Sequence, residues 1–188
     1  MRLRTLFLAL FILAVAMTFG SVQTQAVNEL ISNGGFENGN TSGWTILGGV
    51  FVARFSRSGT FALRLGFARH SGQVSQSFNV PVGVAPTLSF SYRGEAGDDD
   101  KGALIATLLD QNGAIIAQWN GIIDYRWHQV TYQIDSKYAG STLTLTFLGR
   151  PDLAHEFIYY CRPPPFPCRH RVITYAVYSY IDDVSVSY

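Results

Sequence analysis

The sequence lacks an excess of charge of either sign. It has 188 residues, of which 14 are Lys or Arg and 13 are Asp or Glu. All thirteen acidic residues and all but two of the basic ones follow Ala26, so the rest of the chain carries twelve basic and thirteen acidic side chains, a net charge of −1. A near-neutral surface gives no electrostatic reason to expect a nucleic acid or an anionic membrane as partner.

Long apolar runs are absent after the first 26 residues. The apolar run from Leu6 to Phe19 follows two arginines and precedes Thr24-Gln25-Ala26, where a small residue stands at the position that signal peptidase requires. We therefore predict that residues 1–26 are a secretory signal peptide and that residues 27–188 form a secreted chain without a membrane span. The alternative is that the segment stays uncleaved as an N-terminal anchor.

Cysteine is scarce, and the common catalytic motifs are missing. Cys161 and Cys168 are the only cysteines, and because an exported protein can keep them oxidised, we predict one disulfide between them. The sequence has no His-Glu-x-x-His, no Gly-x-Ser-x-Gly and no phosphate-binding glycine loop. We expect no enzyme, although a glycosidase with two carboxylates across a cleft is an alternative that a sequence leaves open.

No long stretch has helical period either, whereas alternating and β-rich runs are separated by glycine turn signals. Within the run Thr87 to Arg93, for example, Leu88, Phe90 and Tyr92 share one face and polar residues share the other, as in a sheet with one packed side. The pattern predicts one all-β sandwich domain. The expected strands are Thr60 to Leu65, Val74 to Val80, Thr87 to Arg93, Ala103 to Asp110, Ala114 to Trp119, His128 to Ile134, Thr142 to Leu148, Phe157 to Tyr160, Val172 to Tyr180 and Val184 to Tyr188.

Several short motifs together carry a family resemblance. They are Asn33-Gly34-Gly35-Phe36-Glu37, Gly43-Trp44, Ser58 to Leu65, Gln76-Ser77-Phe78, Leu88-Ser89-Phe90, Trp127, Tyr138-Ala139-Gly140 and Ile181 to Val186. In this order they resemble the CenC-type carbohydrate-binding modules of families four and nine. The resemblance covers essentially all of residues 27–188 and implies a jelly-roll β-sandwich of the galactose-binding-like superfamily.

The resemblance also implies a structural calcium ion where the first and last strands lie side by side. The matching carboxylates are Glu37 and Asp182, and carbonyl oxygens near Gly35 and Ser58 are the expected further ligands, because calcium takes six to eight oxygens. Two buried acids without a cation would repel each other and suffer desolvation. We expect Asp182 to point inward, with the parity of Val184. The alternative is a pair of solvated acids without a metal.

Sugar recognition combines a flat aromatic face with planar hydrogen-bonding groups. Trp119 and Arg93 are the candidates within the sandwich, although Arg93 could instead form a surface salt bridge. Trp44 and Trp127 match positions that are structural in the resembling modules, so we expect both in the core.

The chain departs from the family pattern between Pro151 and Tyr180, where we expect a hairpin insertion closed by the Cys161–Cys168 disulfide and stiffened by prolines. Closing so short a loop contributes roughly 2 to 3 kcal/mol in the chain-entropy model. One hypothesis is a staple on an exposed hairpin. The other is a preorganised binding tip, for which the ligand-binding candidates are Tyr160, Phe166 and Arg169.

These observations together predict a secreted, calcium-stabilised module that binds a polysaccharide or another glycan without changing it. The alternative, from a different class, is an envelope or adhesion protein. In that case the sandwich is a scaffold, and the Cys161–Cys168 hairpin contacts a cell-envelope protein.

Overall fold

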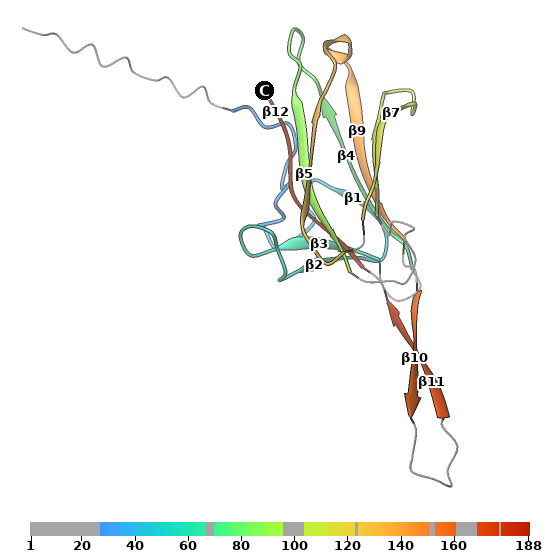
Figure 1. Ribbon diagram of the computed structural model, residues 1–188. Helices are drawn as coiled ribbons and strands as arrows, with labels where there is room; N and C mark the ends of the chain where they lie inside the picture. Colours follow the sequence, from blue (N-terminus) through green and yellow to red (C-terminus); the bar gives the residue numbers. More distant parts are fainter. Residues whose placement is uncertain are drawn as a thin grey trace, which may run out of the picture.

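A computed structural model describes residues 27–66, 70–95, 104–122, 124–150, 153–160, 169–176 and 178–188, with the backbone alone for residues 153–160 and 169–176. It is a β-sandwich with a projecting hairpin (Figure 1). The elements are β1 (Thr45–Gly48), β2 (Val50–Ala53), β3 (Ala62–Leu65), β4 (Gly72–Asn79), β5 (Thr87–Gly94), β6 (Leu104–Leu109), β7 (Ile115–Asn120), β8 (His128–Gln133), the 3₁₀ turn η1 (Ser136–Tyr138), β9 (Thr142–Gly149), β10 (Leu153–Tyr160), β11 (Arg169–Ala176) and β12 (Ser179–Ser187).

The strands of the sandwich form two antiparallel sheets of five strands each. The first sheet has the order β1-β4-β9-β6-β7, and the second has the order β2-β3-β12-β5-β8. The prediction of an all-β sandwich is therefore confirmed. Within the described residues, no helix is long and apolar enough to cross a membrane.

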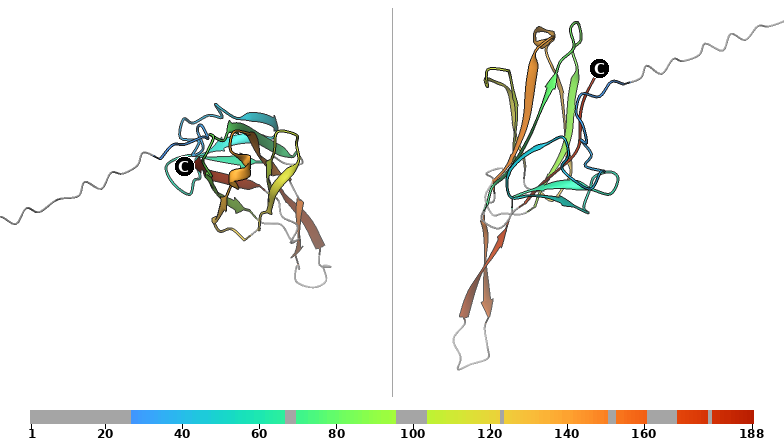
Figure 2. Two further views of the ribbon diagram at one scale, coloured as in Figure 1. Left: turned by 90° about the horizontal axis from the view of Figure 1, so that it is seen from above. Right: turned by 180° about the vertical axis from the view of Figure 1, so that it is seen from behind.

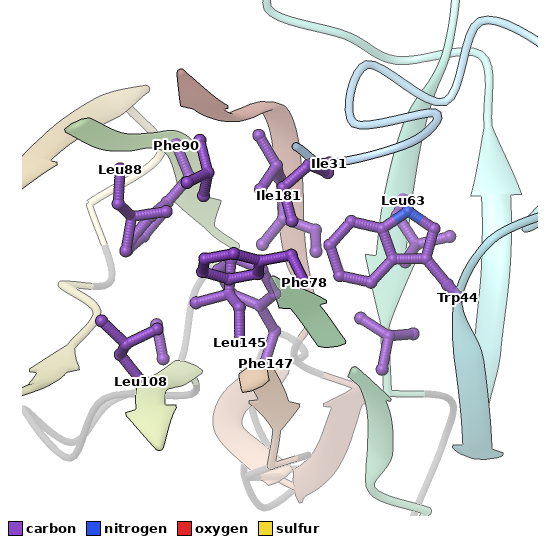
Figure 3. Packing of buried hydrophobic residues seen from close by; sticks show 14 of the residues in the cluster. Ile31, Trp44, Leu63, Phe78, Leu88, Phe90, Leu108, Leu145, Phe147 and Ile181 are labelled. Carbon is purple, nitrogen blue, oxygen red and sulfur yellow. The ribbon is translucent and has the colours of Figure 1, made fainter. Parts of the chain in front are cut away.

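The core lies between the inner faces of the two sheets. In β9, for example, Leu143, Leu145 and Phe147 are fully buried while the threonines between them are not. The rings of Phe90 from the second sheet and Phe147 from the first meet edge to face at 5.0 Å, and Figure 3 shows them among the packed side chains. Such alternation makes one face of each sheet apolar and leaves the other for contact with solvent or ligand.

The beginning and the end of the described chain lie side by side, as the resemblance predicted. The N–H of Leu30 donates to the carbonyl oxygen of Val186 at 2.8 Å, and the N–H of Val184 donates to the carbonyl oxygen of Gly34 at 3.0 Å. A Cβ atom at Gly34 would collide with the carbonyl oxygen of Val184. The opening Asn33 to Glu37 turn therefore needs glycine at this point to approach β12.

Strands β10 and β11 form a hairpin that extends away from the sandwich, as the views in Figures 1 and 2 agree. Its register pairs Leu153 with Ala176 at the base and Tyr160 with Arg169 at the far end. The expected strand from Val172 to Tyr180 was wrong at its end, because β11 stops at Ala176 and Tyr180 belongs to β12. The reason is that Tyr180 pairs with β3 and β5, which the local sequence could not reveal.

The remaining expected strands are confirmed to within a few residues, and two strands were missed. Strand β1 is exposed at all four residues, and β2 has no fully buried residue. Each of these strands has only four residues at the edge of its sheet, and neither shows an alternation of apolar and polar residues. The sequence signal for β1 and β2 was therefore too weak to detect.

Candidate functional site

The loop that joins β2 to β3, residues 54–61, folds over the outer face of the second sheet. The ring of Phe55 lies 4.9 Å from that of Tyr180 in β12. The backbone N–H groups of Arg57 and Ser58 donate to Oδ2 of Asp182 at 2.8 and 3.1 Å. The loop thereby covers Asp182 completely, since this residue has 0% of its surface exposed.

Asp182 is a buried carboxylate whose hydrogen bonds only partly compensate for its loss of water. Burial raises its pKa above the ordinary value, and this effect outweighs the backbone hydrogen bonds from Ser58, Asp183 and Arg57, which lower the pKa. Among the described residues, its Oδ1 accepts one hydrogen bond, from the N–H of Asp183 at 2.7 Å. The alternative of a solvated strand-end acid is therefore wrong for Asp182.

The prediction that Asp182 shares the inward face with Val184 was also wrong. Asp182 is the Cα partner of Ser91, which lies between inward-facing residues of β5, so Asp182 belongs to the outer face. The register of β12 shifts between Asp182 and Ser185, and Asp183 has a φ of +50°. This β-bulge changes the alternation of the strand, so that Val184 returns to the core.

Asp183 and Glu37 hold the same loop at two further points. Asp183 forms an ion pair with Arg57 at 2.9 Å and accepts the hydroxyl hydrogen of Ser58. The exposed Glu37 accepts the N–H of Thr60 on both carboxylate oxygens at 3.0 Å, and its Oε1 also accepts the N–H of Phe61 at 2.9 Å. Three carboxylates thus fix one loop.

The calcium hypothesis fits this arrangement only in part. Glu37 and Asp182 do contact one loop, but the loop presents N–H groups to them, including that of Ser58, which was expected to offer its carbonyl oxygen. Gly35 lies near Glu37, with a built Cβ 3.7 Å from the Cγ atom. The described residues contain no group of three or more His, Cys, Asp or Glu side chains that could hold a metal.

Beside the loop, the outer face of the second sheet carries rings and guanidinium groups. The guanidinium carbon of Arg93 lies 4.6 Å from the ring centroid of Phe55, and that of Arg64 lies 5.1 Å from the ring centroid of Phe51. Phe51 and Phe55 are 42% and 37% exposed. We call this surface the aromatic–arginine patch; its members are Phe51, Phe55, Arg64, Arg93, Trp127 and Tyr180.

Two features of the aromatic–arginine patch concern its polar atoms. Burial is the main cause that raises the pKa of Tyr180, with Glu95 adding to the effect and Arg64 opposing it. Arg93 makes a long ion pair with Glu95 at 4.0 Å, while its Nε atom is buried without a hydrogen-bond partner among the described residues. Arg93 therefore forms a salt bridge, which was the alternative to ligand binding, and its guanidinium group also contacts the ring of Phe55.

The three tryptophans have different environments. Trp44 is in the core, as expected. Trp127 is only half-buried and stacks on Phe55 at 6.2 Å, so its assignment to the core was wrong. Trp119 is half-buried, and its ring meets those of Phe90 in the core and Tyr132 at its margin edge to face, at 5.6 and 5.4 Å. Trp119 therefore does not present its ring as an open platform.

The outer face of the first sheet carries polar and aliphatic but uncharged side chains, a feature that was not predicted from the sequence. The cross-strand register places five side chains in one line, which we call the polar row: Thr45, Ser75, Thr146, Thr107 and Gln118. Beside it, the hydroxyl groups of Ser77 and Thr144 lie 2.9 Å apart. The described strand residues on this face include no charged or aromatic side chain. The threonines at every second position of β9 were the sequence pattern from which this face could have been predicted.

Of the candidates on the hairpin, Tyr160 and Arg169 are Cα partners at its far end. Their side chains are not described. Cys161, Phe166 and Cys168 lie outside the described residues, so the disulfide and the binding tip stay predictions.

No protein-family model matches the chain, and no curated protein matches it significantly. Solved structures are similar in fold. TmCBM61 in complex with β-1,4-galactotriose has a TM-score of 0.58 and 19% identity, over 85% of this chain and 97% of that one. A family 16 carbohydrate-binding module has a TM-score of 0.54 and 13% identity, over 84% and 98%. The enzymatically active domain of bacteriophage CBA120 tailspike protein 4 has a TM-score of 0.54 and 11% identity, over 84% of this chain but 21% of that one. At these identities the likeness shows a shared fold.

Proposed function

We propose that the protein is a secreted, non-catalytic module with the jelly-roll fold of CenC-type carbohydrate-binding modules, and that it binds a glycan on its first sheet. The observation that carries this proposal is the polar row, which crosses all five strands of that sheet. Strands lie about 4.8 Å apart, so the row spans roughly 19 Å. A line of hydroxyl and amide groups of this length matches an extended oligosaccharide, whose hydroxyl groups both donate and accept hydrogen bonds.

The expected ligand is a neutral chain. The described strand residues of this face offer no charge to attract or repel a ligand. Leu148 and Ile105, which are paired in the neighbouring line of residues, supply apolar surface for the C–H side of a sugar ring. The fold neighbour solved with β-1,4-galactotriose supports a neutral galactan as the first probe.

A glycan array followed by titration with β-1,4-galactan and other neutral polysaccharides tests the proposal. Thr146→Val removes a central hydroxyl group of the polar row with little change of shape and should weaken binding about tenfold. Thr131→Val is the matched control, because Thr131 is exposed on the second sheet. The proposal fails if no neutral polysaccharide binds, or if the two variants lose affinity equally.

A structural calcium ion at Glu37 and Asp182 is a second part of the proposal. Its support is the burial of Asp182, because a bound cation would offset the desolvation that raises the pKa of this carboxylate. Asp182 and Glu37 would be ligands, with backbone carbonyl groups near Gly35 and Ser58 completing the oxygen set.

Calcium would stabilise the folded state by mass action, so EDTA should lower the melting temperature and added calcium should restore it. Glu37→Gln should abolish this response to calcium. An unchanged melting curve of the wild-type protein in EDTA would remove calcium from the proposal and leave the glycan site untouched.

A second candidate function is adhesion through the hairpin, with a cell-envelope protein as partner. The observation that favours it is the extension of β10 and β11 beyond the sandwich (Figure 2), since an isolated pair of strands is marginal in water without further support. Tyr160 and Arg169 are the last Cα pair of the hairpin. Cys161 directly follows Tyr160, and Cys168 directly precedes Arg169. We propose that the two cysteines form a disulfide at this end.

Replacing both cysteines with Ser and, separately, Phe166 with Ala tests this candidate in a pull-down from the secreting cell's envelope. If the hairpin tip is the contact, Phe166→Ala should lose the partner without a change in the melting curve. Equal capture by the wild type and Phe166→Ala would eliminate the tip as a contact and favour a disulfide that acts only as a staple.

A further inference from the structure

The turn that leads into β1 presents an asparagine side chain whose amide nitrogen is accessible. Asn40 is exposed, and its Oδ1 atom accepts the backbone N–H of Ser42 at 2.9 Å. An asparagine commonly closes a turn in this way, by a hydrogen bond to the backbone two residues on. Among the described residues, the Nδ2 atom of Asn40 makes no hydrogen bond. The side chain is therefore held by its oxygen while its nitrogen faces solvent.

The backbone of the same turn is fixed independently of this nitrogen. The Nδ2 atom of Asn33 donates to the carbonyl oxygens of Asn40 and Ser42 at 2.9 and 3.3 Å. The N–H of Trp44 donates to the carbonyl oxygen of Thr41 at 3.0 Å. A group attached to Nδ2 of Asn40 would thus break no contact of the described residues, whereas one attached to Asn33 would break two.

The sequence of the turn is that of an acceptor for covalently attached sugar. Asn40-Thr41-Ser42 has the pattern Asn-x-Ser/Thr, with a residue other than proline in the middle, that receives N-linked sugars in secreted proteins. The chain has seven asparagines, and Asn40 is the only one with Ser or Thr two positions later. Ser42 is exposed as well, so both residues that a transferring enzyme reads are accessible.

We infer that Asn40 is a site of N-glycosylation, an inference that rests on the secretion included in the proposed function. The donor is a sugar joined through its C1 atom to a lipid pyrophosphate. Nδ2 of Asn40 attacks C1, the bond from C1 to the pyrophosphate oxygen breaks, and the lipid pyrophosphate leaves with the electron pair. Nδ2 gives up one proton to a base of the transferring enzyme. The hydrogen bond from the N–H of Ser42 stabilises the negative charge that develops on Oδ1 as the proton departs.

The test is mass spectrometry of a tryptic digest of the full chain, isolated from the cell that secretes it. No Lys or Arg lies between Arg4 and Arg54, so a chain cleaved after Ala26 gives one peptide, residues 27–54, that contains both the new N-terminus and Asn40. This peptide should be heavier by at least one sugar residue, with the added mass on Asn40. If the peptide carries no added mass, the inference is overturned.

The same peptide separates this inference from the proposed secretion. Its first residue reports whether the signal peptide was removed, and its mass reports whether Asn40 was modified. An unmodified peptide of residues 27–54 would overturn the inference and leave the secretion intact. A failure of neutral polysaccharides to bind would count against the polar row only.

Two variants of Ser42 show whether an enzyme attached the sugar. Ser42→Ala keeps the N–H that holds Asn40 but removes the hydroxyl group that the acceptor pattern requires, so the added mass should be lost completely. Ser42→Thr keeps a hydroxyl group and should keep the added mass. If Ser42→Ala retains the added mass, the group on Asn40 is not an enzymatically attached N-glycan and the inference fails.

Asn38 and Asn112 are the controls. Asn38 is exposed in the same peptide but has no Ser or Thr two positions later, so it should stay unmodified. Ala114→Thr gives Asn112, on the exposed turn between β6 and β7, the same acceptor pattern and should add a sugar there. A sugar on Asn112 in this variant without one on Asn40 would show that the cell modifies the protein but passes over Asn40, which overturns the inference.

Discussion

The two outer faces of the sandwich differ in how strongly their loops and side chains are fixed in place. The face of the second sheet is covered in part by the loop of residues 54–61, which three carboxylates and several ring contacts fix in place. The face of the first sheet carries short polar side chains beside a few aliphatic ones, and Ser77 and Thr144 contact each other there through their hydroxyl groups. Substitutions on the second sheet should therefore lower the stability of the fold, whereas substitutions on the first sheet should change only the binding of a ligand.

The largest effect is expected from removal of the buried carboxylate. Asp182→Ala leaves the N–H groups of Arg57, Ser58 and Asp183 without their acceptor, and should cost about 3 kcal/mol of unfolding free energy. Denaturation in urea measures it. A loss below about 1 kcal/mol would mean that the loop does not depend on Asp182.

Gly59→Ala should have the next largest effect. Gly59 has a φ of +63°, and a Cβ atom there would lie 2.5 Å from the carboxyl carbon of Glu37. We expect the unfolding free energy to fall by about 2 kcal/mol, partly from backbone strain at the positive φ and partly from displacement of Glu37.

The matched control for Gly59→Ala is Gly113→Ala, because Gly113 has a φ of +81° and nothing within 4 Å of a built Cβ. It should show the backbone cost alone. Equal losses in the two variants, measured by denaturation, would show that the contact with Glu37 contributes nothing.

A smaller, pH-dependent effect is expected at the edge of the second sheet, where Trp127 stacks on Phe55. Asp124 is hydrogen-bonded to His128 at 2.8 Å, and this bond is the main cause that lowers the pKa of Asp124 below 3.8. Because the pKa of Asp124 is lower in the folded state than in the unfolded state, its ionised carboxylate stabilises the fold at pH values above the ordinary pKa. This stability is lost as the pH falls through the lowered pKa. Asp124→Asn should therefore be less stable than the wild type at neutral pH, with a difference that shrinks below pH 3.8. A difference in stability between Asp124→Asn and the wild type that stays constant across this pH range would contradict the lowered pKa of Asp124.

The smallest effect on stability is expected on the first sheet. Thr144→Val removes a hydroxyl group that contacts Ser77 near the surface, and should change the unfolding free energy by less than about 0.5 kcal/mol. Thermal denaturation measures it. A loss close to that of Asp182→Ala would erase the difference between the two faces.

The strands with regular alternation, such as β5 and β9, could be predicted from the sequence because burial of one face imposes a period of two. The approach of Glu37 and Asp182 to one loop was expected from the resemblance. The bulge at Asp183 was not, because a local sequence does not report a positive φ at a residue other than glycine. Phe55 was missed for a related reason, since a loop residue has no period and its contacts with Tyr180 and Arg93 join distant parts of the chain.

Strands β1 and β2 belong to different sheets, yet only Gly49 separates them. The N–H of Gly49 donates to the carbonyl oxygen of Ser71 at 3.0 Å, and its carbonyl oxygen accepts the N–H of Gly66 at 2.8 Å. On the opposite flank, β7 and β8 are joined by a connection of residues 121–127. The sheets are thus joined through a single residue on one flank and through a connection of seven residues on the other. In native-state hydrogen exchange, the amides of Gly49 and Gly66 should exchange only when the whole domain unfolds, whereas those of β7 and β8 should exchange through local opening.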